Sequence, residues 1–437
     1  MIRNGKKKAI SCALVAAMSV GLVACGTTSY DFKVSYDGIK KGDVSSKVSV
    51  HDPSILKADG EYYIFGSHMS AAKSSDLLNW EKVADGYSKK NPVYGQIYDV
   101  ADEAFAYSGS KNSLIKTDDK QVHVWAPDVI YNETTGLYYM YYCTTSTWNA
   151  SNLCYGTSTT PEGPYEWQGA LIYSGFNRKT ISGTDVLDYV DEDYAYKNYI
   201  KGAQYNYEDY PNAIDPTVFY DADGRMWMVY GSWSGGIFLL EIDKTTGLVI
   251  HPEADKANNV DPYYGKRLLG GGHISIEGPY IMYVETSGYY YLFVSYGALT
   301  SNGGYQVRVF RSKTVDGEYV DMNGKYPEKS AQHQNYGLKL TGNYKLPSLE
   351  KAYMATGHNS AFVDDDGKMY LVYHTRFNDN GEGHSPRVHQ MLVNEDGWPC
   401  ELPYQTQGET VNKDGYDTDD IIGRYLSLIH ISEPTRH

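Results

Sequence analysis

One segment type occurs five times in this chain, and its first residue is aspartate in two copies and alanine, glutamate or histidine in the other three. The copies are Asp52-Pro-Ser-Ile, Ala126-Pro-Asp-Val, Asp215-Pro-Thr-Val, Glu277-Gly-Pro-Tyr and His358-Asn-Ser-Ala. Each copy precedes a glycine turn and a strand rich in tyrosine and β-branched residues, and the turns fall at Gly60, Gly136, Gly224, Gly288 and Gly367. These glycines lie 76, 88, 64 and 79 residues apart. Repeats of this length with several short strands predict an all-β fold, a five-bladed β-propeller over residues 50–400.

Radial packing of five blades would bring the first strand of each to a common axis. Asp52, Asp215, Glu277 and His358 would then share one channel, with the three acids at the same phase of the repeat. An isolated Asp-Pro pair is often only a turn device. Three clustered carboxylates repel one another and so cost free energy, which makes such a cluster more typical of a functional site. Glycoside hydrolysis needs two carboxyl groups beside the scissile bond, and a third can raise the pKa of the proton donor.

The net charge of −15 argues against nucleic acid or an anionic membrane as a partner, because neither attracts an acidic surface. Tyrosine is abundant, with 44 residues. Its flat apolar ring and polar tip suit half-buried strands as well as sugar-binding surfaces. The strands alone explain most of these residues, so the count favours carbohydrate only weakly.

The N-terminus is typical of an export signal. Arg3 and three lysines at 6–8 precede an apolar stretch, Ala9 to Ala24, that is short for a membrane span. Leu22-Val-Ala-Cys25 resembles the lipobox of bacterial lipoproteins. We therefore predict a signal peptide over 1–24, a lipid anchor on Cys25 as the single membrane contact, a tether over 25–49 and a location at the cell surface. An ordinary secretory signal is the alternative.

The repeat ends after Trp398-Pro399. Residues 401–425 are predicted to begin a small C-terminal β domain, and residues 426–437 resemble the translation of a sequencing adaptor, which would make them an artefact. We interpret residues 176–210 as a loop insertion, and no segment has a convincing amphipathic helical pattern. Cys143 and Cys154 flank a hairpin, and whether they form a disulfide stays open.

Four of the motifs resemble those of glycoside hydrolase family 43. They are His51-Asp-Pro-Ser-Ile, Trp125-Ala-Pro-Asp-Val, Asn212-Ala-Ile-Asp-Pro and Ser275-Ile-Glu-Gly-Pro-Tyr. Together with Gly231-Ser-Trp-Ser-Gly-Gly-Ile, they are most similar to the endo-1,5-α-L-arabinanases of that family. The resemblance covers about residues 51–399. It implies a five-bladed propeller that hydrolyses internal bonds of plant arabinan with inversion, and we expect a monomer.

The resemblance also implies roles for individual residues. Asp52 corresponds to the general base, Glu277 to the general acid, and Asp215 to the acid that tunes and holds Glu277. Contacts with arabinose are expected from Asn212, Ala213, Ile214, Ser232, Trp233 and Ser234. Asn149 is a further predicted contact with arabinose, at a position where arabinanases often have glycine. Trp125 is interpreted as a wall of the sugar cleft, with core packing as the alternative.

His358 is the predicted metal ligand. The resemblance implies a calcium ion held in the channel by this histidine and surrounding waters. A hydrogen-bonded core histidine is the alternative, because calcium prefers oxygen ligands. His374 is the competing candidate, with a structural or substrate-side role favoured. Two other functions remain open: an exo-acting α-L-arabinofuranosidase or β-xylosidase of the same family, and a glycan-binding lipoprotein without turnover.

Overall fold

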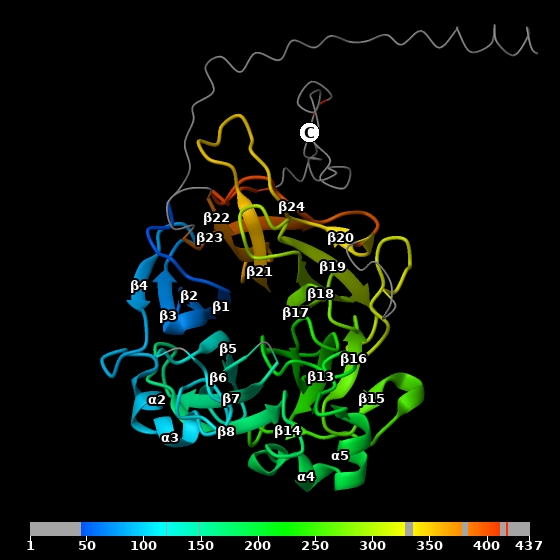
Figure 1. Cartoon of the computed structure of the whole chain (residues 1–437). Helices are drawn as coiled ribbons and strands as arrows, with labels where there is room; N and C mark the ends of the chain where they lie inside the picture. Colours follow the sequence, from blue (N-terminus) through cyan, green and yellow to red (C-terminus); the bar gives the residue numbers. More distant parts are fainter. Residues whose placement is uncertain are drawn as a thin grey trace, which may run out of the picture. The chain divides into compact units, whose positions relative to one another are not determined.

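Each sequence repeat forms one antiparallel sheet, and the five sheets follow one another around a ring, which confirms the predicted five-bladed β-propeller (Figure 1). The computed structural model describes residues 45–118, 120–147, 149–327, 335–377, 383–410 and 417. The predicted signal peptide and lipid anchor lie outside these residues, as does most of the predicted tether. The predicted C-terminal domain beyond residue 417 and the predicted artefact at 426–437 also lie outside them. None of the helices in the described part reaches the length and apolarity that crossing a bilayer requires.

Four blades consist of four consecutive strands, and the third blade has additional short strands. Blade 1 contains β1 (Ser54–Ala58), β2 (Glu61–Gly66), β3 (Ser70–Ser74) and β4 (Glu81–Ala84). Blade 2 contains β5 (Val124–Asn132), β6 (Leu137–Thr145), β7 (Ser151–Ser158) and β8 (Glu166–Tyr173). Blade 3 contains β11 (Thr217–Tyr220), β12 (Met226–Tyr230), β13 (Ile237–Ile242), β14 (Val249–Ile250), β15 (Val260–Asp261) and β16 (Gly265–Leu269).

The last two blades complete the ring. Blade 4 contains β17 (Ile276–Val284), β18 (Tyr289–Tyr296), β19 (Gln306–Ser312) and β20 (Leu338–Lys339). Blade 5 contains β21 (Met354–Val363), β22 (Met369–Arg376), β23 (Ser385–Val393) and β24 (Pro399–Glu401). Short helices α2 (Gly95–Asp99) and α3 (Ala101–Ala104) and the 3₁₀ turns η1 (Ser67–Met69) and η3 (Lys256–Asn258) lie in the connections.

Turn chemistry sets the register of the first hairpin of each blade. In blade 1, Asp59 and Gly60 connect β1 to β2, and their φ angles are 53° and 81°. Two consecutive left-handed residues make the hairpin turn whose twist matches that of the strands, and Asp-Gly is a preferred sequence for it. The tyrosine-rich strand that follows therefore pairs directly with the inner strand of its blade.

The core lies between the blades, in layers that each join one blade to the next. Cys143 packs with residues of blades 2 and 3, whereas Cys154 packs with residues of blades 1 and 2. Their strands pair with Tyr142 opposite Cys154 and Cys143 opposite Leu153. Because neighbouring residues on a strand point to opposite faces, the two thiols face apart. Both are free cysteines, so the possible disulfide does not form.

In the part of the chain that the structure describes, side-chain packing rather than a shared sheet joins blades 1 and 5. Each of these blades is built from consecutive strands, and no described strand of one joins the sheet of the other. Ile55, Ile64 and Trp80 of blade 1 pack against Tyr370 and Val372 of blade 5. The Ser360 hydroxyl also donates to the Pro53 carbonyl at 2.8 Å. Each large apolar side chain buried there contributes about 1.5–3 kcal/mol.

The insertion between blades 2 and 3 is ordered and contributes to the core, which the sequence analysis did not anticipate. It forms η2 (Ile181–Gly183), α4 (Val186–Tyr189), α5 (Glu192–Asn198), β9 (Ile200–Lys201) and β10 (Gln204–Tyr205). Phe176, Val186 and Tyr199 are buried against blades 2 and 3. These helices have only four to seven residues. That is too short for helical periodicity to stand out in the sequence.

The segment after the last repeat continues along blade 5. The predicted C-terminal domain begins at Glu401, which is the last residue of β24. The N–H of Leu402 donates to the carbonyl of Gln390, and the N–H of Thr406 donates to the carbonyl of Val388, both on β23. Residues 401–406 therefore extend the edge of the propeller.

Glycines of blade 3 provide a matched test of this packing. Gly236 and Gly224 both have positive φ, but a Cβ at Gly236 would lie 2.2 Å from the Leu269 carbonyl, whereas one at Gly224 would meet nothing within 4 Å. We expect Gly224→Ala to lower the free energy of unfolding by about 1–2 kcal/mol through backbone strain alone. Gly236→Ala should cost about 3 kcal/mol or more, because backbone must also move. Denaturant unfolding measures both; equal losses would contradict the packing argument.

Candidate active site

Every inner strand has a left-handed residue at the equivalent point of the repeat, just before the strand in blades 1 and 3 and inside it in the other three. The φ angles are 55° at Asp52, 41° at Ala126, 55° at Asp215, 56° at Gly278 and 47° at His358. In blades 2, 4 and 5 a β-bulge at this point leaves two residues opposite one on the neighbouring strand. Such a bulge redirects a side chain that would otherwise follow the strand alternation. One repeated backbone distortion therefore turns the residues at this point of each blade toward the common axis.

The repeated φ value corrects the predicted alignment of the three acids. Asp52 and Asp215 occupy the left-handed position, but in blade 4 that position is Gly278. Glu277 is the residue before it and is equivalent to His51 and Ile214. The three acids therefore occupy two different positions of the repeat. Glu277 nevertheless reaches the shared space, because a glutamate side chain is one methylene longer than an aspartate.

The three acids border one cavity of about 270 Å³. Its walls come from all five blades and combine acids, histidines and aromatic rings. The lining residues are His51, Asp52, Ser67, His68, Trp125, Asn212, Ile214, Asp215, Ser232, Trp233, His273, Glu277, Leu299 and His358. The predicted convergence of distant segments is therefore observed.

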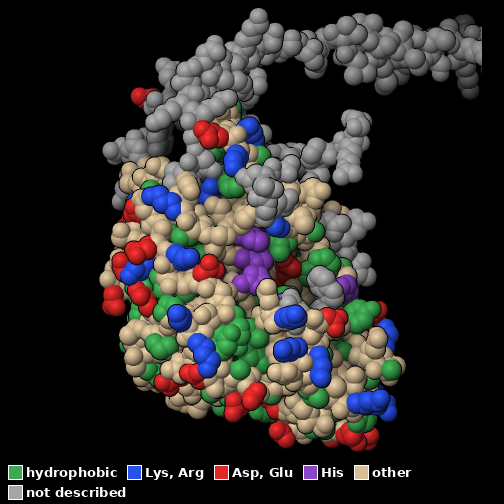
Figure 2. All heavy atoms as spheres, turned by 60° about the vertical axis from the view of Figure 1, so that its left-hand side comes forward, with side chains coloured by type: hydrophobic (Ala, Val, Ile, Leu, Met, Phe, Trp, Pro, Cys, Tyr) green, Lys and Arg blue, Asp and Glu red, His purple; other side chains and the backbone are tan. Residues whose placement is uncertain are grey.

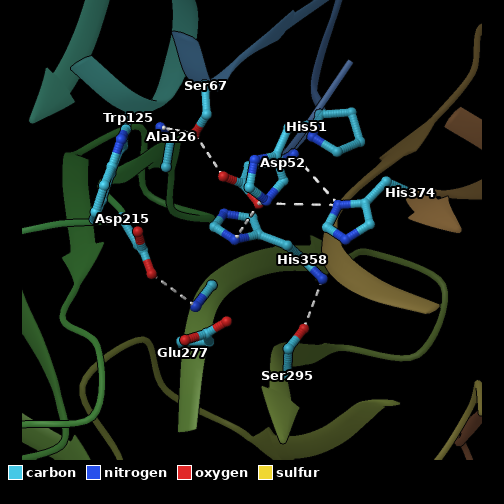
Figure 3. A network of polar contacts seen from close by, with 12 residues as sticks. His51, Asp52, Ser67, Trp125, Ala126, Asp215, Glu277, Ser295, His358 and His374 are labelled. Atoms are coloured by element: carbon cyan, nitrogen blue, oxygen red, sulfur yellow. Dashed lines mark hydrogen bonds and ion pairs between the residues drawn. The ribbon is translucent and has the colours of Figure 1, made fainter. Parts of the chain in front are cut away.

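Asp52 is held by a dense set of polar contacts (Figure 3). The Ser67 hydroxyl donates to Asp52 Oδ2, and that hydroxyl itself accepts from the N–H of Ala126 at 2.8 Å. Asp52 Oδ1 lies 3.0 Å from His358 Nδ1 and 3.1 Å from His51 Nε2. Burial alone would raise the pKa of this carboxyl, but the charge of His358 and the hydrogen bond from its ring hold the pKa well below its usual value. Asp52 is therefore an ionised carboxylate.

Glu277 has the opposite electrostatic setting. Trp233 Nε1 donates to its Oε2 at 2.6 Å, and the Tyr305 hydroxyl donates to its Oε1 at 2.7 Å. Desolvation at the cavity wall raises the pKa of Glu277 despite these two hydrogen bonds. A carboxyl group that keeps its proton to higher pH suits the role of a proton donor.

Asp215 acts on Glu277 through both charge and backbone. It is buried, and its Oδ2 accepts from the N–H of Gly278, the residue after Glu277, at 3.2 Å. Burial and the neighbouring charges of Glu277 and Asp52 raise the pKa of Asp215, although His358 opposes the shift. Close carboxyl groups resist ionising together, so Asp215 and Glu277 titrate as a coupled pair.

His358 forms an ion pair with Asp52 at the centre of the site. Its N–H donates to the Ser295 hydroxyl at 2.7 Å. Burial would lower the pKa of this imidazole, but Asp52 and the other two acids raise it to about 9. The Nδ1 contact with a carboxylate is the arrangement that orients metal-binding histidines and leaves Nε2 as the ligand atom. With a pKa of about 9 the Nε2 atom carries a proton at neutral pH, so an ion would take this single nitrogen by displacing that proton.

Most of the predicted sugar-contacting residues line the cavity. Asn212, Ile214, Ser232, Trp233 and Trp125 do so. Three predicted residues, Asn149, Ala213 and Ser234, are not among those that line it. Ala213 is fully buried in the core between blades 2 and 3, Ser234 is fully buried beside His273, and the Asn149 carbonyl accepts a hydrogen bond from Ser174.

Several residues at the site were not found from the sequence. Tyr305 and Ser67 contact the acids directly, and His68, His273 and Leu299 line the cavity. These residues lie outside the strand-start motifs, so the repeat carried no signal for them. His374 is completely buried, and its Nδ1 accepts from the N–H of Asp52 at 3.3 Å. This contact supports the structural role that the sequence favoured for His374.

Residues 44–209 and 191–399 match the family described as Glycosyl hydrolases family 43. The chain belongs to glycosyl hydrolase family 43. The family resemblance inferred from the motifs is thus confirmed over most of the chain.

Individual members of family 43 are similar along most of their length. An extracellular endo-α-(1→5)-L-arabinanase of Thermotoga petrophila is 40% identical over 399 residues, covering 88% of this chain and 77% of that protein. The extracellular endo-α-(1→5)-L-arabinanase 2 of Bacillus subtilis is 37% identical, covering 89% and 77%. The crystal structure of an endo-1,5-α-L-arabinanase from Thermotoga petrophila RKU-1 superimposes with a TM-score of 0.72 at 38% identity, covering 88% of this chain and 80% of that one.

The Tyr305 hydroxyl provides a test of how Glu277 is tuned. Tyr305→Phe removes a hydrogen bond that favours the ionised carboxylate, so the pKa of Glu277 should rise and the alkaline limb of the kcat profile should move to higher pH. We expect kcat at the optimum to fall about tenfold as the carboxyl loses a positioning contact. Tyr296→Phe is the matched control, because this buried hydroxyl has no hydrogen-bond partner among the described residues. An alkaline limb at unchanged pH in Tyr305→Phe would contradict the assignment of Glu277 as the group that this hydroxyl tunes.

Gly278 tests the contact between the backbone of blade 4 and the ion pair. A Cβ at Gly278 would lie 3.0 Å from the His358 ring, whereas one at Gly288 would meet only the end of Lys313 at 3.7 Å. Both glycines have positive φ, so each alanine variant should lose about 1–2 kcal/mol of stability. Only Gly278→Ala should also displace His358 from Asp52 and lower kcat, by about tenfold or more. Steady-state kinetics at 25 °C, where both variants are folded, measures kcat for each. An equal kcat in the two variants would contradict the expected displacement of His358.

Proposed function

We propose that this family 43 glycoside hydrolase cleaves internal α-1,5-L-arabinofuranosidic bonds of arabinan. The observation that carries this proposal is the opposed electrostatic setting of two carboxyl groups in one cavity. The charge of His358 holds the pKa of Asp52 low, while desolvation raises the pKa of Glu277. The endo-arabinanase names of the two similar relatives supply the substrate and the mode of attack.

In the proposed mechanism Asp52 and Glu277 act from different sides of the scissile bond. Asp52 accepts a proton from a water molecule, which attacks the anomeric carbon, while Glu277 donates its proton to the departing oxygen. Desolvation and the charge on Asp52 raise the pKa of Glu277, while the hydrogen bond from the Gly278 N–H to Asp215 fixes the backbone beside Glu277. A single displacement with water inverts the anomeric configuration.

The predicted calcium ion and the lipid anchor belong to the same proposal. His358 would hold the ion through Nε2 with water completing the shell, and the ion would supply positive charge beside the acids. Export is supported because both similar relatives are named extracellular. The lipid on Cys25 stays a prediction, because Cys25 lies outside the described residues.

Glu277→Gln tests the proton donor. This isosteric change removes the proton that Glu277 would deliver, so kcat on linear arabinan should fall by about 10³-fold or more, while arabino-oligosaccharide binding should remain. Glu401→Gln is the matched control, because Glu401 is also buried but contacts His389 in blade 5. Reducing-sugar assays and calorimetry provide the two measurements. Unchanged sugar release by Glu277→Gln would refute the assignment.

The products of the unmodified protein separate the competing functions. Early release of a mixture of oligosaccharides, with inverted anomeric configuration in proton NMR, is the expected result. Release of arabinose or xylose alone from chain ends would support the exo-acting alternative. Binding of arabinan with no cleavage by the full chain would support the glycan-binding alternative.

A further inference from the structure

Three histidines gather beside the active site but outside the set of catalytic groups. His51 precedes β1, His374 lies on β22 and His384 precedes β23; one potential ligand atom from each lies within 4.8 Å of the others. The ring centroids are 3.8 Å apart for His51 and His384, 4.8 Å for His374 and His384, and 5.1 Å for His51 and His374. His51 and His384 are stacked at 14°, so one of these two rings must turn for both lone pairs to point at one ion. Figure 2 shows histidine side chains gathered on one face, and Figure 3 shows His51 and His374 beside Asp52.

The cluster leaves several buried ring nitrogens without a hydrogen bond. Among the described residues, His51 Nδ1 and the Nε2 atoms of His374 and His384 have no hydrogen-bond partner, whereas His51 Nε2 has the ion-pair contact with Asp52 Oδ1. An unsatisfied buried polar atom costs about 1–3 kcal/mol. Three such atoms on three neighbouring rings require an explanation that a single stray atom does not.

We propose that His51, His374 and His384 form a binding site for one borderline divalent transition-metal ion of the Zn²⁺ class. Imidazole nitrogen suits Zn²⁺, Co²⁺, Ni²⁺ and Cu²⁺. Three histidine ligands with a fourth position left to water is a common zinc arrangement. Because His51 also lines the cavity, the ion would form part of the wall of the active site.

The protonation state of the rings favours a metal ion over a proton. Burial lowers the pKa of His51 to about 4 and that of His384 to about 3, and it also lowers the pKa of His374. All three imidazoles are therefore neutral at pH 7, as ligands must be. Like-charge repulsion would oppose three imidazolium ions at this spacing, whereas one divalent ion bonds to all three rings.

The charged neighbours of the cluster act in opposite directions. Asp52 Oδ1 lies 3.1 Å from His51 Nε2 and offsets positive charge there. Arg376 acts against a cation, because its charge already lowers the pKa values of His51 and His384. Asp52 touches a ring directly, while Arg376 donates to the Leu299 carbonyl, so the carboxylate has the stronger effect.

His374 must rearrange a proton to serve as a ligand. Its Nδ1 accepts from the N–H of Asp52, which places the proton of the neutral ring on Nε2. Binding through Nε2 therefore moves that proton to Nδ1 and breaks the hydrogen bond from the Asp52 N–H. Asp52 Oδ1 lies 3.9 Å from Nδ1, so the ring must move toward the carboxylate before it can donate there. A carboxylate that accepts from the second ring nitrogen is usual for histidines in metal sites.

This site differs from the predicted calcium position. Calcium takes oxygen ligands, whereas the three histidines offer nitrogen. His358 is outside the cluster, since its Nδ1 contacts Asp52. Loading with a transition metal and loading with calcium are therefore separable by variants.

Cobalt titration of the full chain, prepared without a polyhistidine tag, tests the proposal. We expect one Co²⁺ per chain, with the visible absorption bands of a four-coordinate site and displacement by Zn²⁺ but not by Ca²⁺. His384→Gln should weaken binding about 100-fold or more through loss of a ligand. His251→Gln is the matched control, because that buried histidine also lacks hydrogen bonds among the described residues but packs on Tyr189 and Tyr263.

The contrary results are distinct. Absence of the cobalt bands in the unmodified protein would overturn the proposal and leave water as the partner of these nitrogens. Binding that survives His384→Gln and His51→Gln would overturn it too. Binding lost in His358→Gln but kept in His384→Gln would assign the ion to the predicted calcium position instead. Circular dichroism establishes that each variant is folded, and arabinan hydrolysis is assayed separately, so failure of this proposal is distinguishable from failure of the proposed function.

Discussion

The site depends on one backbone constraint, the left-handed residue at the equivalent point of each inner strand. Four of the five positions carry a side chain, and left-handed φ costs an L-residue about 1–3 kcal/mol. Packing between neighbouring blades holds the strands that follow, so the strain is maintained by the ring as a whole. The distortion breaks the strand alternation at the same place in each blade. It thereby directs Asp52, Asp215 and His358 to one cavity.

Convergence alone would produce a repulsive cluster of acids, and the asymmetry of their surroundings makes it useful. Asp52 has histidine and serine partners that favour its ionised form. Glu277 and Asp215 are desolvated and repel each other's charge, which favours retention of a proton. The same cavity can therefore hold a base and an acid at one pH. His358 connects the two halves, because the pKa of its imidazole responds to all three carboxyl groups.

Sequence repetition was enough to predict the five blades, the convergence of the acids and the placement of His358. It was wrong about the phase of Glu277, because the motif was aligned on the acids, whereas φ aligns Gly278 with Asp52. It left the cysteine pairing open, because strand register decides which face each thiol takes. It missed Tyr305 and Ser67, which come from segments after the conspicuous motifs, and it read the 176–210 insertion as a loop although its aromatic residues complete the core.

Local sequence determined the strands, the turns and which ionisable groups stand at strand starts, because these depend on neighbouring residues. The partners of those groups were decided only by the tertiary structure. Trp233 and Tyr305 reach Glu277, and three histidines meet beside Asp52, through contacts between residues far apart in the chain. Such contacts set hydration and charge at each carboxyl, and those two quantities, not the residue type, separate a proton acceptor from a proton donor.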